Sequence, residues 1–86
     1  MDRRNSLEIT AKILQIAEKG ALRSHIAFEA KLNYKCLKNY LDVLEKRGLI
    51  TSDGNPGNKV RTTQKGRLFA QQYRNLLQLL GQEQDK

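Results

Sequence analysis

The side chains with the most evident chemical use in this sequence are hydrogen-bond donors concentrated in its middle. Nine Lys and Arg residues and three Asp and Glu residues lie between positions 31 and 67, so this segment carries +6 of the net charge of +7. Lysine and arginine donate to phosphate oxygens and to guanine O6 and N7, and asparagine can pair with adenine through two hydrogen bonds. This clustering predicts a surface that binds a polyanion, with double-stranded DNA as the first candidate.

The first candidate contacts lie on a helix expected at about residues 33–47. Tyr34, Lys35, Lys38 and Asn39 occupy its N-terminal half, which is the part of a reading helix that approaches base edges. We expect Asn39 to pair with adenine. The two lysines either donate to guanine or contact phosphate, and phosphate contact is the more common of the two.

A second group of candidate contacts lies outside this helix. Lys59 and Arg61 alternate along an expected strand and therefore project to the same side, where they can straddle the DNA backbone beside a minor groove. Arg23 and Lys65 are further candidates for phosphate contact.

Other reactive side chains are too few to build a catalytic centre. The sequence has one histidine and one cysteine, and it shows neither metal-ligand spacing nor a glycine-rich loop that opens a helix. We therefore expect no enzyme activity, no metal, no cofactor and no small-molecule ligand. His25 is expected at the surface, and Cys36 is expected to fill space as a small apolar residue rather than to act as a redox sensor.

Several short elements must position these side chains. Apolar spacing and glycine stops predict three helices, at about residues 6–19, 24–31 and 33–47, and a strand rung at 21–23. Ser6, Ser24 and Asn33 are placed to cap the three helices. The expected buried residues are Ile9, Ile13, Ile16 and Ala17 in the first helix, Ile26, Ala27 and Ala30 in the second, and Leu37, Leu41 and Leu44 in the third.

A hairpin should follow the third helix. Residues 49–51 are β-prone, residues 53–58 are rich in turn formers, and residues 59–62 alternate polar and apolar side chains. These segments predict a wing at about residues 51–62, built on a sheet of two strands, or of three if the rung at 21–23 joins it.

The last helix should begin after Thr63, which is placed as its cap. Its apolar residues recur with the spacing of a coiled-coil seam, and the expected dimerisation residues are Phe69, Tyr73, Leu76, Leu77 and Leu80. Such a helix is longer than a small core can cover, so we expect it to pair antiparallel with a second copy. The alternative is that it folds back onto the first helix.

Two short motifs, in order and at the right separation, resemble the winged helix-turn-helix superfamily. They are LDVLEKRGLI at residues 41–50 and TQKG at residues 63–66. The opening SLEI and the KLNY turn at residues 31–34 resemble more narrowly the archaeal ten-kilodalton winged-helix DNA-binding proteins and the ArnR-like regulators. This resemblance implies a homodimer, held by an antiparallel coiled coil of the last helices, that presents two reading helices and two wings to duplex DNA.

The expected fold is therefore α+β and mostly α: a winged helix-turn-helix with a C-terminal dimerisation helix. We expect a single domain, with the core and wing at residues 1–62 and the last helix and tail at 63–86. No apolar run approaches the roughly 18 residues that span a bilayer, and the N-terminus lacks a signal-peptide pattern. This favours a protein without membrane contact, located in the cytoplasm and associated with the nucleoid.

Three hypotheses for function stay open at this stage. The first is a dimeric transcription regulator that reads the major groove with residues 33–47. The second is an architectural DNA-binding protein of low specificity, which would use the same surface through lysine and phosphate. The third, a winged-helix module that binds protein, is disfavoured by the charge of residues 31–67.

Overall fold

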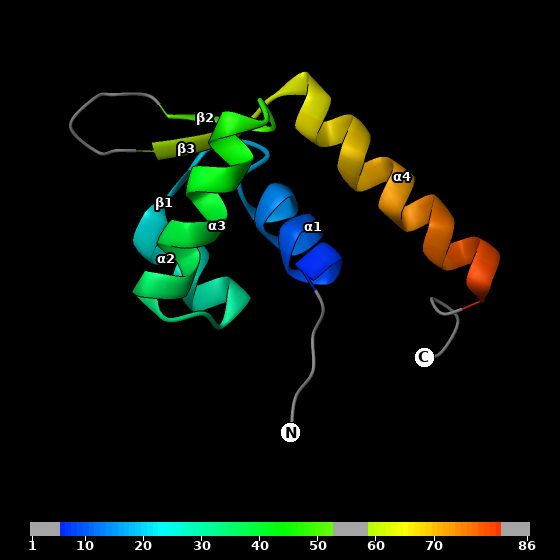
Figure 1. Cartoon of the computed structure of the whole chain (residues 1–86), viewed down its shortest axis with the longest axis horizontal. Helices are drawn as coiled ribbons and strands as arrows, with labels where there is room; N and C mark the ends of the chain where they lie inside the picture. The colour runs from blue at the N-terminus through cyan, green and yellow to red at the C-terminus, as the bar shows by residue number, and fades with distance from the viewer. Residues whose placement is uncertain (1–5, 53–58, 82–86) are drawn as a thin grey trace.

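A computed structural model describes residues 6–52 and 59–81 of the chain. This part contains four helices and three strands (Figure 1). In chain order they are α1 (Ser6–Ile16), β1 (Ala21–Leu22), α2 (Arg23–Ala30), α3 (Tyr34–Lys46), β2 (Ile50–Ser52), β3 (Lys59–Thr62) and α4 (Gln64–Leu80). The predicted turn at 53–58 and the predicted tail at 82–86 lie outside the described residues.

The three strands form one antiparallel sheet in the order β1-β3-β2, so the three-stranded version of the predicted wing sheet is confirmed. Val60 pairs with Ala21 on one side and with Ser52 on the other. Side chains alternate across a strand, and Val60 and Thr62 accordingly face the core while the rest of β3 is exposed. The wing therefore presents one polar face to solvent.

The core lies where α1, α2 and α3 meet the inner face of this sheet. Its buried apolar residues are Ile9, Ile13, Leu14, Ala17, Ala21, Ile26, Ala30, Leu37, Leu41, Leu44, Leu49, Ile50 and Val60. Thr62 is buried with them, and both of its donors have acceptors: the Thr62 Oγ1 donates to the Leu14 carbonyl at 2.7 Å and the amide to the Ala17 carbonyl at 3.0 Å. These bonds fix the end of α1 to the wing.

Two of the predicted N-caps are confirmed. Asn33 accepts a hydrogen bond from the Cys36 amide through Oδ1 at 2.8 Å, and the Thr63 hydroxyl accepts one from the Gly66 amide at 3.1 Å. The predicted cap at Ser24 is wrong, because α2 begins at Arg23 and Leu22 flanks it without a side-chain cap. Leu22 is still paired in the sheet, so the strand runs directly into the helix.

Helix ends and buried faces differ from the sequence-based prediction in four more places, and one of them is Ala27, which is half-buried and not buried. Helix α1 ends at Ile16 and not near residue 19, and Leu14 takes the buried place predicted for Ile16, which is half-buried. The two residues differ in angle around the helix, and Leu14 lies on the side of α1 that α4 covers. Helix α2 ends at Ala30, because Lys31 adopts a left-handed conformation with φ of 58°.

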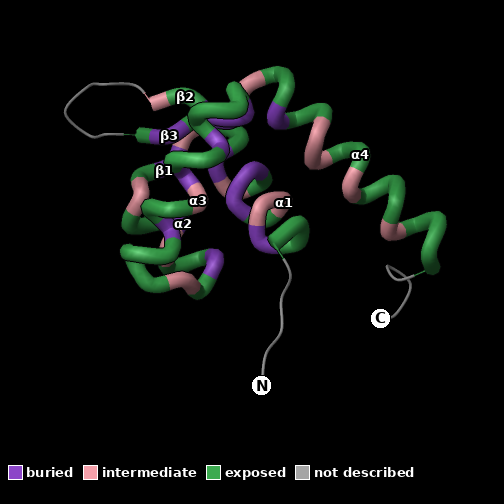
Figure 2. The backbone as a smooth tube through the Cα atoms, in the orientation of Figure 1, coloured by how far each residue is buried: buried purple, intermediate pink, exposed green. Residues whose placement is uncertain are grey.

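Helix α4 differs from the other helices in how little of it is covered. It begins beside the wing and runs along one side of the molecule, where it packs against α1 (Figure 1). Figure 2 shows it almost entirely exposed or half-buried, and Gly66 is its one buried residue. Its apolar face is therefore poorly covered by this chain.

Candidate nucleic-acid interface

Helix α3 presents a polar stripe to solvent opposite its buried face. The buried residues Leu37, Leu41 and Leu44 face the core. On the opposite side the exposed residues recur at spacings of four, three and four, which keeps them in one line along a helix. This outward stripe consists of Lys35, Asn39, Asp42 and Lys46. It combines two cations with one amide and one carboxylate; the cations and the amide can meet phosphates and base edges, and the carboxylate can accept a hydrogen bond from cytosine.

The other predicted contacts of α3 border this stripe. Tyr34 and Lys38 are exposed on one flank. Cys36 is a free, exposed thiol on the other flank, so the expectation that it fills space is wrong. The residue next to a buried position on a helix turns about 100° away from it, and here that turn carries the Cys36 side chain out of the core.

The solvent face of the wing holds the second predicted pair. Lys59 and Arg61 are both exposed, and they share one face of β3 as the alternation predicts. The two differ in surroundings. The Arg61 guanidinium lies against Gly20, where an added Cβ would be 3.5 Å from Nη2. Arg61 therefore lies at the base of the wing, and Lys59 lies two residues farther along β3 toward the tip.

The remaining two predicted phosphate contacts have partners within the protein. The Arg23 guanidinium donates through Nη2 to the Ser52 hydroxyl at 3.2 Å, which links the start of α2 to the wing. The Lys65 ammonium donates to the Arg47 carbonyl at 2.9 Å, at the C-terminal end of α3. Arg23 and Lys65 thus hold elements of the interface together.

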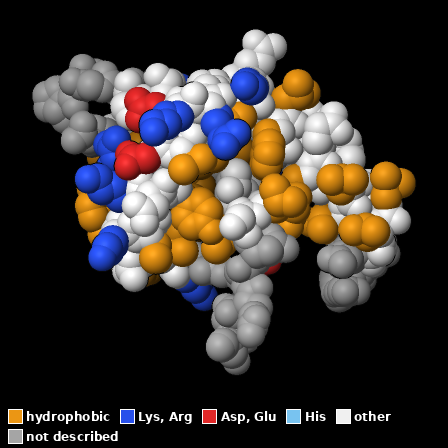
Figure 3. Space-filling model, in the orientation of Figure 1, with side chains coloured by type: hydrophobic (Ala, Val, Ile, Leu, Met, Phe, Trp, Pro, Cys, Tyr) orange, Lys and Arg blue, Asp and Glu red, His pale blue; other side chains and the backbone are white. Residues whose placement is uncertain are grey.

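Cationic and apolar side chains occupy different parts of the surface. In Figure 3, Lys and Arg side chains gather over α3 and the strands of the wing, with two acidic side chains among them. Hydrophobic side chains run along α4 on the opposite side of the same view.

Helix α4 has one wide apolar face, and the structure divides the predicted dimerisation residues by burial. Phe69, Tyr73 and Leu77 are half-buried toward α1, whereas Leu76 and Leu80 are exposed. With two leucines absent from the predicted set they form an exposed leucine row, which comprises Leu68 at 57%, Leu76 at 54%, Leu79 at 83% and Leu80 at 68% exposure. The coiled-coil spacing could not separate covered from exposed positions, because the apolar face is continuous.

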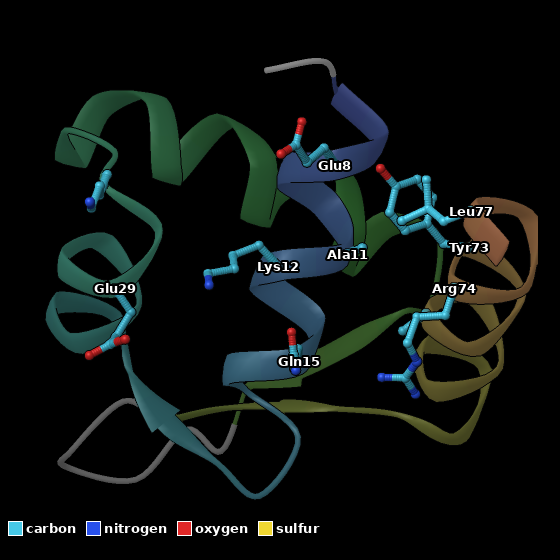
Figure 4. A pocket seen from close by; sticks show the side chains of 10 residues that line it. Glu8, Ala11, Lys12, Gln15, Glu29, Tyr73, Arg74 and Leu77 are labelled. Atoms are coloured by element: carbon cyan, nitrogen blue, oxygen red, sulfur yellow. The ribbon is translucent and has the colours of Figure 1, made fainter. Parts of the chain in front are cut away.

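A groove of about 590 Å³ lies over α1, between α4 and the end of α2. Figure 4 shows Tyr73 and Arg74 of α4 on one side of α1, and Lys12 of α1 extending toward the other side, where Glu29 of α2 lies. Burial raises the pKa of the Tyr73 phenol above its ordinary value of 10.0, and the carboxylate of Glu8 raises it further. Helix α4 packs along α1, so the alternative in which the last helix folds back onto the first describes its inner side, while its outer leucines stay exposed.

The sequence profile of the winged helix-turn-helix family matches residues 3–81, which is most of the chain. The chain belongs to the winged helix-turn-helix family. No curated protein matches the sequence.

Two solved winged-helix structures are similar to this one. The first is Sso10a-2, a DNA-binding protein from Sulfolobus solfataricus, with a TM-score of 0.82, 25% identity, and coverage of 91% of this chain and 83% of that chain. The second is Sco5413, a MarR family transcriptional regulator from Streptomyces coelicolor, with a TM-score of 0.77, 20% identity, and coverage of 86% of this chain and 56% of that chain. At 20% identity, the similarity to Sco5413 shows a shared fold and nothing more.

These comparisons confirm the predicted fold class and the resemblance to small archaeal winged-helix DNA-binding proteins. They also agree with the prediction that the chain is not an enzyme, because the winged helix-turn-helix is a binding fold and carries no catalytic machinery of its own. Within residues 6–52 and 59–81, no three His, Cys, Asp or Glu side chains are grouped to hold a metal ion. No helix in the described part of the chain has the length and apolar character of a membrane span.

In winged-helix terms, α2 and α3 are the helix-turn-helix pair and α3 is its second helix. The turn between them is short, because Lys31 reverses the chain in a left-handed conformation and Asn33 already caps α3. Helix α3 and the strands of the wing lie on the same half of the molecule (Figure 1).

Proposed function

We propose that this protein binds double-stranded DNA with α3 in the major groove and with the wing against the backbone or minor groove. The observation that carries the proposal is the outward stripe: two lysines and an asparagine lie in line on a capped helix whose other face is fully packed. An α-helix fits the major groove of B-DNA. The similarity to a protein described as DNA-binding supports this assignment.

The proposal includes a homodimer formed through the exposed leucine row of α4. Four leucines on one side of a helix need an apolar partner, and a second copy supplies a self-complementary surface through two-fold symmetry. In an antiparallel pair, Leu68 of one protomer meets the Leu79 and Leu80 end of its partner. The two α3 helices then face the same DNA duplex.

Within this proposal the protein regulates transcription by occupying specific sites at the chromosome, as a cytoplasmic protein associated with the nucleoid. Asn39 is the residue that favours sequence reading, since its amide can pair with adenine. An architectural role of low specificity is the second candidate. It is favoured by the lysines of α3, which contact phosphate irrespective of sequence. Selection of bound sequences from a random duplex pool separates the two, because a regulator enriches a motif and an architectural protein does not.

The experiment that tests DNA binding is its salt dependence. Each phosphate contact that is lost should lower the slope of log affinity against log salt by about 0.9. We expect Lys35→Ala with Lys38→Ala to weaken binding at least tenfold at low salt and to lower the slope by about one to two. Lys12→Ala, which removes an exposed cation from α1, is the matched control and should change neither quantity. An equal loss in both variants would contradict the proposed interface.

A further inference from the structure

The C-terminal end of α3 and the N-terminal end of α4 are joined by a compact set of hydrogen bonds. The Lys65 ammonium donates to the Arg47 carbonyl at 2.9 Å, and the Thr63 hydroxyl donates to the Gly48 carbonyl at 2.7 Å. The Thr63 amide donates to the Leu49 carbonyl at 3.0 Å. We name these residues, 47–49 and 63–66, the α3–α4 joint. Three consecutive carbonyls after α3 thus have donors from the residues that begin α4.

Gly66 brings the two backbones into direct contact at the joint. A Cβ at this position would lie 2.2 Å from the Leu49 carbonyl oxygen and 2.7 Å from Cγ2 of Thr62. Contacts below 3.0 Å require something to shift, and here one of the two atoms belongs to the backbone. The glycine is needed for space, because it is the one residue of α4 that is buried. The joint is therefore a backbone contact, which is stiffer than contact between flexible side chains.

Charge reinforces the same contact. The last carbonyls of a helix carry a partial negative charge and lack partners within the helix. Helix α3 ends at Lys46, Gly48 follows with a φ of 77°, and the Leu49 amide donates back to the Leu44 carbonyl at 2.9 Å. The Lys65 cation then lies at the negative end of α3. The residues that begin α4 therefore supply hydrogen-bond donors to the carbonyls that follow α3.

Beyond the joint, α1 is the main support of α4. The α4 side chains on this contact are half-buried, and a groove of about 590 Å³ opens beside it. A helix of 17 residues is about 25 Å long at 1.5 Å per residue, so a 10° change at its start moves its far end by roughly 4 Å. That displacement is close to one base-pair step of about 3.4 Å.

We infer that Thr63, Lys65 and Gly66 are positioning residues that fix the angle between α3 and α4 and thereby set the spacing of DNA half-sites that the homodimer accepts. This inference rests on the proposed function, because spacing has meaning only for two reading helices on one duplex. It assigns to Lys65 a role other than the phosphate contact expected from sequence. Lys65 acts on DNA through α3.

The separation of the two α3 helices can be measured directly. Cys36 is the one cysteine of the chain and is exposed in the first turn of α3, so a nitroxide on it reports the distance between the two reading helices of a dimer by pulsed electron resonance. We expect one narrow distance in the wild type and a distribution broadened or shifted by several ångströms in Lys65→Met. Lys65→Arg should restore most of the narrow distribution. Arg67→Met removes a neighbouring exposed cation and should change nothing, and an unaltered distribution in Lys65→Met would overturn the inference.

Binding to DNA supplies the second readout. On duplexes with two half-sites at varied spacing, Lys65→Met should flatten the spacing preference at least threefold while its affinity for a single half-site stays within twofold of the wild type. Loss of single-site affinity with a lower salt slope would instead make Lys65 a phosphate contact and would overturn the inference.

Failure of the dimer can be told apart from failure of the joint. A monomer labelled at Cys36 alone gives no dipolar signal, which contradicts the proposed dimer. A second label at Gln78→Cys, on the exposed part of α4, then measures the α3 to α4 distance within one chain. Broadening of this intrachain distance in Lys65→Met and Thr63→Val supports the joint, and an unchanged distance in both variants refutes it.

Discussion

Helices α3 and α4 are both amphipathic, but they leave opposite faces uncovered. The three leucines of α3 are buried, and most of what remains in solvent is a polar stripe with lysines and an asparagine. Helix α4 buries only Gly66, and what remains in solvent is a row of leucines. The first helix exposes a surface suited to a polar ligand, whereas the second exposes a surface suited to an apolar partner. The exposed surface of α3 is therefore suited to binding a polar ligand, and that of α4 to assembly with an apolar surface.

The largest expected effect tests whether α3 is the better packed of the two. Leu41 is 3% exposed, so Leu41→Ala leaves a cavity and should lower the free energy of unfolding by about 2–5 kcal/mol. Leu77→Ala makes the same change on the half-buried side of α4 and should cost about half as much or less. Urea unfolding followed by circular dichroism measures both values. Equal losses would contradict the comparison.

The next effect tests the uncovered leucines. Leu79→Asp places a charge in the most exposed position of the leucine row and should shift the dimer to monomer at micromolar concentration, since a buried unpaired carboxylate costs several kcal/mol at an interface. Gln71→Asp adds the same charge to an exposed position outside that row and is the control. Sedimentation equilibrium gives the mass of each. A monomeric wild type, or equal dissociation in both variants, would exclude this interface.

Features fixed by neighbouring residues could be predicted from the sequence. The caps at Asn33 and Thr63 depend on an amide three residues away, and the buried face of α3 follows from one helical period. The exposure of the stripe of Lys35 and Asn39 was predictable for the same reason, because it is the complement of that face.

Features fixed by tertiary contacts could not be predicted. The sequence offered Ser24 as a cap, but pairing of Leu22 with Lys59 across the sheet moved the start of α2. It offered Lys65 as a phosphate contact and gave no sign of its hydrogen bond to the Arg47 carbonyl, 18 residues earlier in the chain. No local pattern carries these distant contacts, and apolar spacing alone could not separate the covered from the exposed positions of α4.

A smaller effect compares the caps of the two helices. Asn33→Ala removes one capping bond at an exposed site and should lower the free energy of unfolding by about 1 kcal/mol. Thr63→Ala removes the bond from Gly66 and also leaves the Gly48 carbonyl without its donor, so its cost should be greater. Asn33→Ser and Thr63→Ser retain the caps and should stay near the wild type. A larger loss in Asn33→Ala would mean that the joint contributes no more than an ordinary cap.

The smallest effect concerns the side of α4 that faces α1. The raised pKa of Tyr73 means that the folded protein favours the neutral phenol, first because of burial and then because of the Glu8 carboxylate. The stabilisation that depends on this shift is present below about pH 10 and is lost as the pH rises through the raised pKa of the folded state. Tyr73→Phe should therefore reduce the loss of thermal stability above pH 10, while Tyr34→Phe at the exposed start of α3 should not. Titration of phenolate absorbance should lose, in Tyr73→Phe, a component with a midpoint above 10.0, and this component should move down slightly in Glu8→Gln, since the charge is the lesser cause. If the component lost in Tyr73→Phe had a midpoint at or below 10.0, Tyr73 would be solvated and α4 would lie farther from α1 than their packing indicates.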